Sequence, residues 1–277
     1  MYKIEDNNML VSEVMEKNIR KVSIDKDQKL IDAIEMMRKQ NLSTLLCTND
    51  DKLAGIITER ELADRLGSVK AKSLKASSLH VSTSMYYKPK VVTPETDLSE
   101  VAEIMLKEKV SGLPVIENDS PVGLITYNEM TLICQKLDYI PLSKILTKKL
   151  IKISVDDRLI HARNVIFDKE VSVLPVMDGN QLVGIISEGM IARAFADFRE
   201  NVPSRHQEER VRHIFVSDAM RINPKTLKSD DSIGEAARIL LDEGMRGIPI
   251  VNNNDKLIGI VTKTDMVKLV KNKLRVD

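Results

Sequence analysis

The chain has 277 residues, enough for about two domains of average size, and its 42 Lys and Arg nearly balance 41 Asp and Glu. A net charge of +1 argues against a general nucleic-acid coat, which needs a basic excess to displace counterions from phosphate. Aromatic residues make up 3% and Trp is absent, so a base-stacking platform is also disfavoured.

The cysteine and hydropathy patterns narrow the class of protein further. Cys47 and Cys134 lie far apart and form no CxxC pair, which predicts two buried thiols in a reducing compartment rather than a disulfide or a zinc site. Residues 1–10 have no signal-peptide core, and no apolar stretch approaches the roughly 18 residues of a membrane helix. The sequence predicts a cytoplasmic protein with no membrane contact. Because no catalytic or metal-binding spacing is visible, we expect no enzyme activity, no catalytic cofactor and no metal.

One phrase recurs four times along the chain. In each copy a glycine, two apolar residues and a Thr or Ser are followed by a helix-like stretch, and the copies occupy 53–61, 122–129, 182–190 and 257–265. A short apolar run and a polar turn precede each phrase, which predicts a β-hairpin. Before each hairpin, apolar residues recur at helical spacing, as in Leu30, Ala33, Ile34 and Met37.

These observations predict an α+β (α/β) protein of four repeats, each with the order strand, helix, strand, strand, helix. The predicted repeats span 8–66, 78–138, 139–198 and 213–277, and a charged linker holding Pro203 covers about 195–213. A unit of about 55 residues buries too little apolar surface to be stable alone. We therefore expect neighbouring copies to pair, as 1–138 and 139–277.

The repeated residues resemble the cystathionine beta-synthase (CBS) domain, which occurs in tandem pairs called Bateman modules. The resemblance rests on a Leu-Pro-Val strand such as 113–115, a turn, a Gly-Ile-Ile-Thr phrase and an acidic residue three positions later. It covers nearly the whole chain and implies two modules, similar to the gamma subunit of AMP-activated protein kinase and to archaeal stand-alone CBS proteins. It implies a regulatory protein that binds AMP, ADP, ATP or S-adenosylmethionine in clefts between paired domains and transmits occupancy to a protein partner.

The fourth repeat is the strongest candidate site. At Thr262 a strand gives way to a helix, so free backbone N–H groups and the helix dipole favour a phosphate. One turn later, Asp265 matches the family residue that accepts the two ribose hydroxyls. The resemblance also implies that Arg246 faces the phosphates, and that adenine is held by strand residues of the same repeat: Ile248, Pro249, Ile222 and Thr226.

The other repeats carry weaker versions of this phrase. The first has Thr58 and Glu61, and the second has Thr126 and Glu129. The third has Met190 in place of an acid, so we expect its site to be empty or altered.

A structural explanation competes with each of these assignments. Thr followed three residues later by an acid is also a capping box, which satisfies amides at a helix N-terminus. Arg246 is equally consistent with a solvated surface residue, and Lys263 could add positive potential but, at a helix start, is more typical of a solvated residue. If the Asp265 carboxylate turned back onto its own backbone with no cavity beside it, the sensor hypothesis would fail.

Two other functions stay open at this point. One is an interaction scaffold whose ligand sites have decayed, and the other is a nucleic-acid-associated regulator acting through Arg210 and Arg212 of the charged linker. We rank nucleic acid last, and expect a monomer or homodimer with an adenine nucleotide and an unidentified protein as partners.

Overall fold

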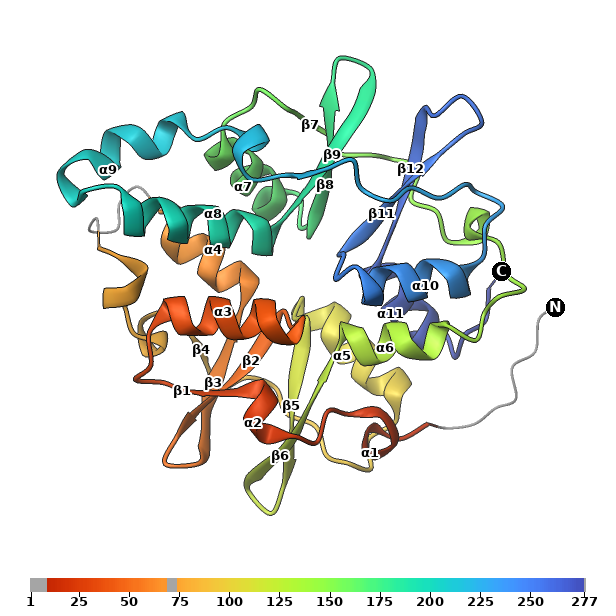
Figure 1. Cartoon of the computed structure of the whole chain (residues 1–277). Coiled ribbons are helices and arrows are strands. Elements are labelled where there is room, and N and C mark those ends of the chain that lie inside the picture. Colours follow the sequence, from red (N-terminus) through yellow and green to blue (C-terminus); the bar gives the residue numbers. More distant parts are fainter. Residues whose placement is uncertain (1–8, 69–73, 277) are drawn as a thin grey trace.

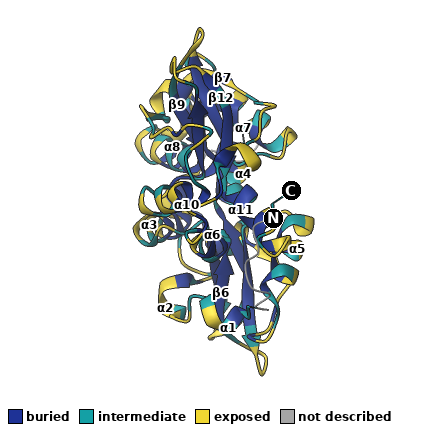
Figure 2. Cartoon of the chain, turned by 90° about the vertical axis from the view of Figure 1, so that its right-hand side faces the viewer, coloured by how far each residue is buried: buried dark blue, intermediate teal, exposed yellow. Residues whose placement is uncertain are grey.

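The computed structural model describes residues 9–68 and 74–276. Repeats 1 and 2 form one half of the molecule and repeats 3 and 4 the other, with helices of both halves meeting in the middle (Figure 1). Seen at 90° to that view, buried strands run along the centre and exposed helix faces lie on either side (Figure 2). Within the described residues, the helices are too short or too polar to span a membrane.

The helices and strands follow the predicted order in each repeat. Repeat 1 contains α1 (Val11–Val14), α2 (Ile19–Val22), β1 (Ser23–Asp25), α3 (Leu30–Gln40), β2 (Thr44–Asn49), β3 (Lys52–Thr58) and α4 (Glu59–Gly67). Repeat 2 contains β4 (Tyr86–Tyr87), α5 (Leu98–Glu108), β5 (Gly112–Glu117), β6 (Ser120–Thr126) and α6 (Tyr127–Cys134). Repeat 3 contains β7 (Ile153–Ser154), α7 (Leu159–Asp168), β8 (Val173–Asp178), β9 (Gln181–Ser187) and α8 (Glu188–Asn201), after which comes α9 (Ser204–Arg210). Repeat 4 contains β10 (Arg221–Ile222), α10 (Ile233–Asp242), β11 (Gly247–Val251), β12 (Leu257–Thr262) and α11 (Lys263–Lys271).

The repeated hairpins form where turn residues allow a left-handed backbone. Asp50 and Asp51 have φ of 50° and 60°, and Gly179 has φ of 55° at the equivalent turn of repeat 3. Asn, Asp and Gly tolerate this conformation best. The strands β2 and β3 then pair antiparallel with Thr44 opposite Thr58, and the predicted α+β fold of four repeats is confirmed.

The first strand of repeat 4 differs from the prediction. The segment leading into repeat 4 pairs first with repeat 3, through β10 on β9, and only at Leu227 with its own strand residue Ile250. Asn223 has φ of 46° and Pro224 has no N–H to donate, so the chain changes partner between the two pairings. The expected continuous strand from Ile222 to Thr226 was therefore wrong.

This exchange of edges is reciprocal in both halves. Glu16 of repeat 1 pairs with Leu124 of repeat 2, while β4 of repeat 2 pairs with β3 of repeat 1. Likewise, Thr147 of repeat 3 pairs with Ile260 of repeat 4 while β10 crosses in the opposite direction. Each sheet is completed by the neighbouring repeat, as the predicted pairing of repeats requires.

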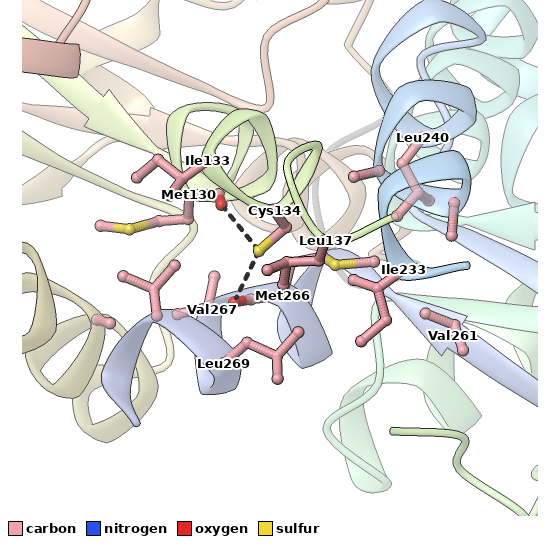
Figure 3. Close-up of a cluster of buried hydrophobic side chains, with 14 of the residues drawn as sticks. Met130, Ile133, Cys134, Leu137, Ile233, Leu240, Val261, Met266, Val267 and Leu269 are labelled. Carbon is pink, nitrogen blue, oxygen red and sulfur yellow. Dashed lines mark hydrogen bonds between the residues drawn. The ribbon is translucent and has the colours of Figure 1, made fainter. Parts of the chain in front are cut away.

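The two large hydrophobic cores, however, join the halves rather than the neighbours. One core lies mainly between repeats 1 and 3, where α4 packs on α8. The other lies mainly between repeats 2 and 4, where α11 packs on α5 and α6. In this second core the Cys134 thiol lies 3.4 Å from the Met130 carbonyl oxygen and 3.7 Å from that of Met266 (Figure 3). Burial raises the pKa of Cys134 to about 12, and Cys47 is likewise buried and unpaired.

The segment expected to be a charged linker is largely helical. Helix α8 continues to Asn201 because Phe195 is fully buried and Arg199 is only 5% exposed. The Arg199 side chain donates hydrogen bonds to the carbonyl oxygens of Leu66 and Ser68, at the end of α4. The segment therefore connects repeat 3 to repeat 1 as well as to repeat 4, and the predicted linker is largely helical.

Candidate functional site

A cavity of about 410 Å³ lies beside the start of α11, and we call it the Asp265 cavity. Thr262 and Asp265 of repeat 4 line it, opposite the 147–151 segment and residues 170–175 of repeat 3. Thr58, Arg60 and Glu61 of repeat 1 and residues 106–111 of repeat 2 complete its wall. All four repeats therefore contribute to one cavity of the size that small-molecule sites have.

The Asp265 carboxylate is turned back onto its own helix start. One of its oxygens accepts hydrogen bonds from the Thr262 backbone N–H at 2.9 Å and from the Thr262 hydroxyl at 2.8 Å. The other oxygen, Oδ1, lies 3.0 Å from the Lys268 ammonium. This is the capping box that was the alternative to a ribose site. Because the carboxylate also borders a cavity, only one of the two conditions that together would reject the sensor hypothesis is met.

Arg246 is a buried residue and not a solvated one. Its guanidinium contacts a Glu59 carboxylate oxygen at 2.7 and 3.1 Å, and both side chains are nearly buried, at 10% and 13% exposure. Glu59 belongs to repeat 1, so this ion pair crosses between the halves. Arg246 lines the Asp265 cavity, as expected for a residue that could reach a phosphate there.

A second ion pair crosses the same boundary. Arg60 of repeat 1 lies 2.8 Å from the carboxylate of Glu188, the first residue of α8. Burial raises the pKa of Glu188 to about 7, against the opposing influence of Arg246 and Arg60. A Cβ on the next residue, Gly189, would lie 1.9 Å from a Glu59 oxygen, so glycine is required for this close approach.

The first residues of the four equivalent helices were missed as site candidates. They are Glu59, Tyr127, Glu188 and Lys263, each directly after the Thr or Ser of a phrase. Tyr127 and Glu188 line the Asp265 cavity, whereas Glu59 and Lys263 line a second one. Their shared position in the repeat was the available signal, because pseudo-equivalent residues converge when repeats pack around a centre.

Four predicted residues of repeat 4 lie elsewhere. In the described part of the chain, Pro175 lines the Asp265 cavity where Pro249 was expected. Thr147 lines it where the first strand of repeat 4 was expected. Ile248 is fully buried in the core, while Ile222 is 63% exposed on β10. Because the repeats exchange edges, Ile248, Pro249, Ile222 and Thr226 do not meet Asp265, and their assignment to this site is corrected.

The first repeat has a cavity of its own. This Glu61 cavity, of about 290 Å³, is lined by Thr58 and Glu61 and by the segment 86–90 of repeat 2. It shares Arg60 and Lys109 with the Asp265 cavity, so the two adjoin on one face. Glu61 caps its helix by accepting from the Thr58 backbone N–H at 3.0 Å.

In the second repeat, the Thr and the acid are hydrogen-bonded to each other. Glu129 accepts hydrogen bonds from the Thr126 N–H and hydroxyl, both at 2.6 Å. Burial raises its pKa, and neither residue lines any of the three cavities described. Thr126 and Glu129 therefore act as a helix cap in this structure.

The third repeat also borders a cavity, of about 380 Å³, which we call the Met190 cavity. It is lined by Ser187 and Met190 at the start of α8 and by residues 242–246 of repeat 4, with Arg246 shared between this cavity and the Asp265 cavity. Within 9–68 and 74–276, no cluster of three or more His, Cys, Asp or Glu is arranged to hold a metal ion.

The four repeats, their exchanged edges and the cavities at their helix starts define a class of protein. Residues 11–68, 80–133, 142–197 and 216–272 each match the CBS domain, and the chain belongs to the CBS domain family. Its four domains form two CBS pairs, or Bateman modules.

Individual relatives share this organisation. MJ1225 of Methanocaldococcus jannaschii is 24% identical over 235 residues, which are 79% of this chain and 83% of that protein. Its crystal structure, of a protein proposed as an archaeal homologue of g-AMPK, covers 95% of this chain and all of its own with a TM-score of 0.80 at 20% identity.

Two further proteins are similar to this chain. An uncharacterized 33.4 kDa protein in a ribosomal RNA operon of Thermofilum pendens is 24% identical over 230 residues, which are 78% of this chain and 76% of that protein. A conserved protein of Pyrococcus horikoshii covers 95% of this chain and all of its own, with a TM-score of 0.61 at 18% identity. The MJ1225 and Pyrococcus horikoshii structures show that this fold recurs.

Proposed function

We propose that this chain is a non-catalytic regulatory protein that senses an adenosine ligand in the Asp265 cavity. AMP, ADP, ATP and S-adenosylmethionine are the candidate ligands, and an energy-sensing role in the cytoplasm follows if a nucleotide is bound. The observation that carries the proposal is the convergence of Thr262, Asp265 and Arg246 on one 410 Å³ cavity between paired CBS repeats.

The cavity offers groups for both ends of such a ligand. Five cationic side chains line it and favour phosphates or another anionic tail, namely Arg60, Lys109, Lys149, Arg246 and Lys268. Apolar side chains lie around the 147–151 segment and the β8 strand, and they suit a flat base, namely Leu150, Ile151, Val171, Val173 and Pro175. Oδ1 of Asp265 has Lys268 as its only hydrogen-bond partner in the described chain and faces a site where a hydroxyl can replace that lysine.

A ligand in this cavity would change the ion pairs at the boundary between the modules. Arg246 and Arg60 line the cavity, and both hold carboxylates across that boundary, at Glu59 and Glu188. A ligand phosphate that draws either arginine away weakens an inter-module ion pair. A ligand shifts a protein between two arrangements only when it prefers one of them, and this exchange of partners supplies such a preference.

One observation favours a different function, an interaction scaffold with decayed sites. Glu61, Glu129 and Asp265 all accept a hydrogen bond from the backbone N–H of the Thr three residues earlier, so all three already serve as caps. A scaffold would hold a stable protein partner that nucleotides do not affect. For a nucleic-acid-associated role, the charge pattern of the sequence is the sole support.

Isothermal titration calorimetry with the four candidate ligands tests the proposal. Replacing Asp265 by Asn keeps an oxygen for the cap but removes the charge, so Asp265→Asn should fold normally and bind the preferred ligand at least about tenfold more weakly.

The matched control is Asp230→Ala, which removes an exposed carboxylate that lines none of the three cavities. It should bind as the wild type does. If none of the four ligands binds, or if Asp265→Asn binds as tightly as the wild type, the sensor hypothesis is rejected and the scaffold is favoured.

A further inference from the structure

The Met190 cavity has an excess of positive charge. Five basic and three acidic side chains line it, the basic ones being Arg38, Arg193, Arg221, Arg246 and Lys263. Two of the acids are already engaged, since Glu59 pairs with Arg246 and Arg193, and Glu243 pairs with Lys225 and Arg221. Asp242 is the one lining acid with no ion pair in the described part of the chain.

Lys263 is the most informative of these basic residues, because its side chain is buried. It is only 5% exposed, and its ammonium donates to the Asn128 amide oxygen at 2.6 Å. Among residues 9–68 and 74–276, no carboxylate lies within ion-pair distance of it. Burial and the nearby Arg246 lower its pKa to about 7. Glu59 and Glu129 oppose this lowering, but in the described chain neither forms an ion pair with Lys263. A buried ammonium is costly, and an anion in the cavity would add a direct counter-charge.

A second cation reaches the cavity from the other module. Arg38, in the last turn of α3, is exposed and has no ion pair within the residues described. The cavity also borders the start of the fourteen-residue helix α8, where the Glu188 N–H donates to the Ser172 carbonyl oxygen at 3.3 Å. The Ser187 hydroxyl is 3.5 Å from the Met190 N–H, at the limit of a hydrogen bond, so this helix start is weakly capped.

The same cavity lacks the features that hold a nucleoside. Met190 stands where Asp265 stands in repeat 4, and a thioether is a poor acceptor for ribose hydroxyls. We propose that the Met190 cavity binds a di- or triphosphate anion, recognised by Lys263, Arg246 and Arg38, with no grip on a ribose. The anion is either free or the tail of a nucleotide.

This site stands independently of adenosine binding in the Asp265 cavity. Arg246 lines both cavities, so an anion that engages it in the Met190 cavity changes the charge available to a ligand in the other. The two cavities nevertheless have private cations, Arg38 and Lys263 for one and Lys149 and Lys268 for the other. These private residues allow the two sites to be tested separately.

Calorimetric titration of the full chain with sodium tripolyphosphate and with pyrophosphate provides the test. The wild type should bind one anion per chain. Arg38→Ala, which removes no ion pair or side-chain hydrogen bond of the described residues, and Lys263→Met, which keeps the side-chain length, should each weaken binding about tenfold.

Lys149→Ala is the matched control because it removes one exposed cation from the Asp265 cavity alone. It should leave tripolyphosphate binding unchanged. Absence of binding in the wild type would overturn the inference, and so would a loss that follows Lys149 rather than Arg38.

ATP competition then identifies the source of the anion. ATP that displaces tripolyphosphate from the Asp265→Asn variant marks the nucleotide tail as the ligand, whereas failure to displace it marks the free anion. Adenosine binding that disappears in Asp265→Asn while tripolyphosphate binding persists shows that the two proposals stand or fall separately.

Discussion

The Asp265 and Met190 cavities lie at equivalent helix starts of repeats 4 and 3, yet their chemistry differs. Each lies where a hairpin strand meets a helix, and each includes Arg246. The first combines a carboxylate with an apolar wall that includes Pro175, whereas the second has a thioether and three arginines besides Arg246. The repeated backbone thus places a helix N-terminus at both cavities, and a few side chains determine which ligand each cavity can bind.

Removing the shared residue should have the largest effect on this comparison. Arg246→Met leaves the Glu59 carboxylate buried without its main partner, and breaking a buried ion pair costs about 3 kcal/mol of unfolding free energy. Urea unfolding at pH 7 measures the loss.

The double variant Arg246→Met with Glu59→Gln should recover part of that stability, because no unpaired charge then remains. If Arg246→Met is as stable as the wild type, the ion pair does not join the halves as described.

An intermediate effect is expected from making the two cavities alike. Met190→Asp places a carboxylate at the position of Asp265, where it can cap α8 and accept ribose hydroxyls. We expect calorimetry to show an additional adenosine-ligand site, and tripolyphosphate binding weakened about fivefold through like-charge repulsion.

The neutral variant Met190→Asn serves as the reference for this change. Identical behaviour of the Asp and Asn variants would mean that residue 190 does not face the ligand.

The last effect is a dependence of stability on pH. The pKa of Glu188 is raised to about 7 from 4.5, so between these values the folded chain binds more protons and stability falls as pH rises. The pKa of Lys263 is lowered to about 7 from 10.5, so between these values the unfolded chain binds more protons and stability rises with pH. Thermal unfolding should show a minimum near pH 7.

Each arm of that pH curve belongs to one residue. Lys263→Met should remove the rise above pH 7, and Glu188→Gln should remove the fall below it. A curve without a minimum, unchanged by either variant, would contradict the burial of these two charges in neighbouring cavities.

The repeats were predictable because the signals that specify them are local. The stripe from Leu30 to Met37 is buried as its helical spacing predicted, and the turn at Asp50 and Asp51 folds as its residue types require. Thr262 and Asp265, which the family resemblance implied as site residues, line a cavity, and their part in ligand binding stays a prediction.

The composition of the site was less predictable because it depends on pairing between distant segments. Nothing periodic in the sequence shows that Thr147 crosses to Ile260, so the wall of the Asp265 cavity was assigned to the wrong strand. The partner of Arg246 lies 187 residues away in sequence. Lys263 was taken as solvated because a helix start is usually exposed, and only the packing of the modules buries it.

The exchange of sheet edges also determines which fragments of this chain can exist on their own. A fragment ending at residue 68 would lose the β4 edge and would leave the residues around Glu16 with no strand to pair with. The pair, rather than the single repeat, is therefore the smallest segment that can be excised or transplanted into another protein with the hydrogen bonds of its sheets intact.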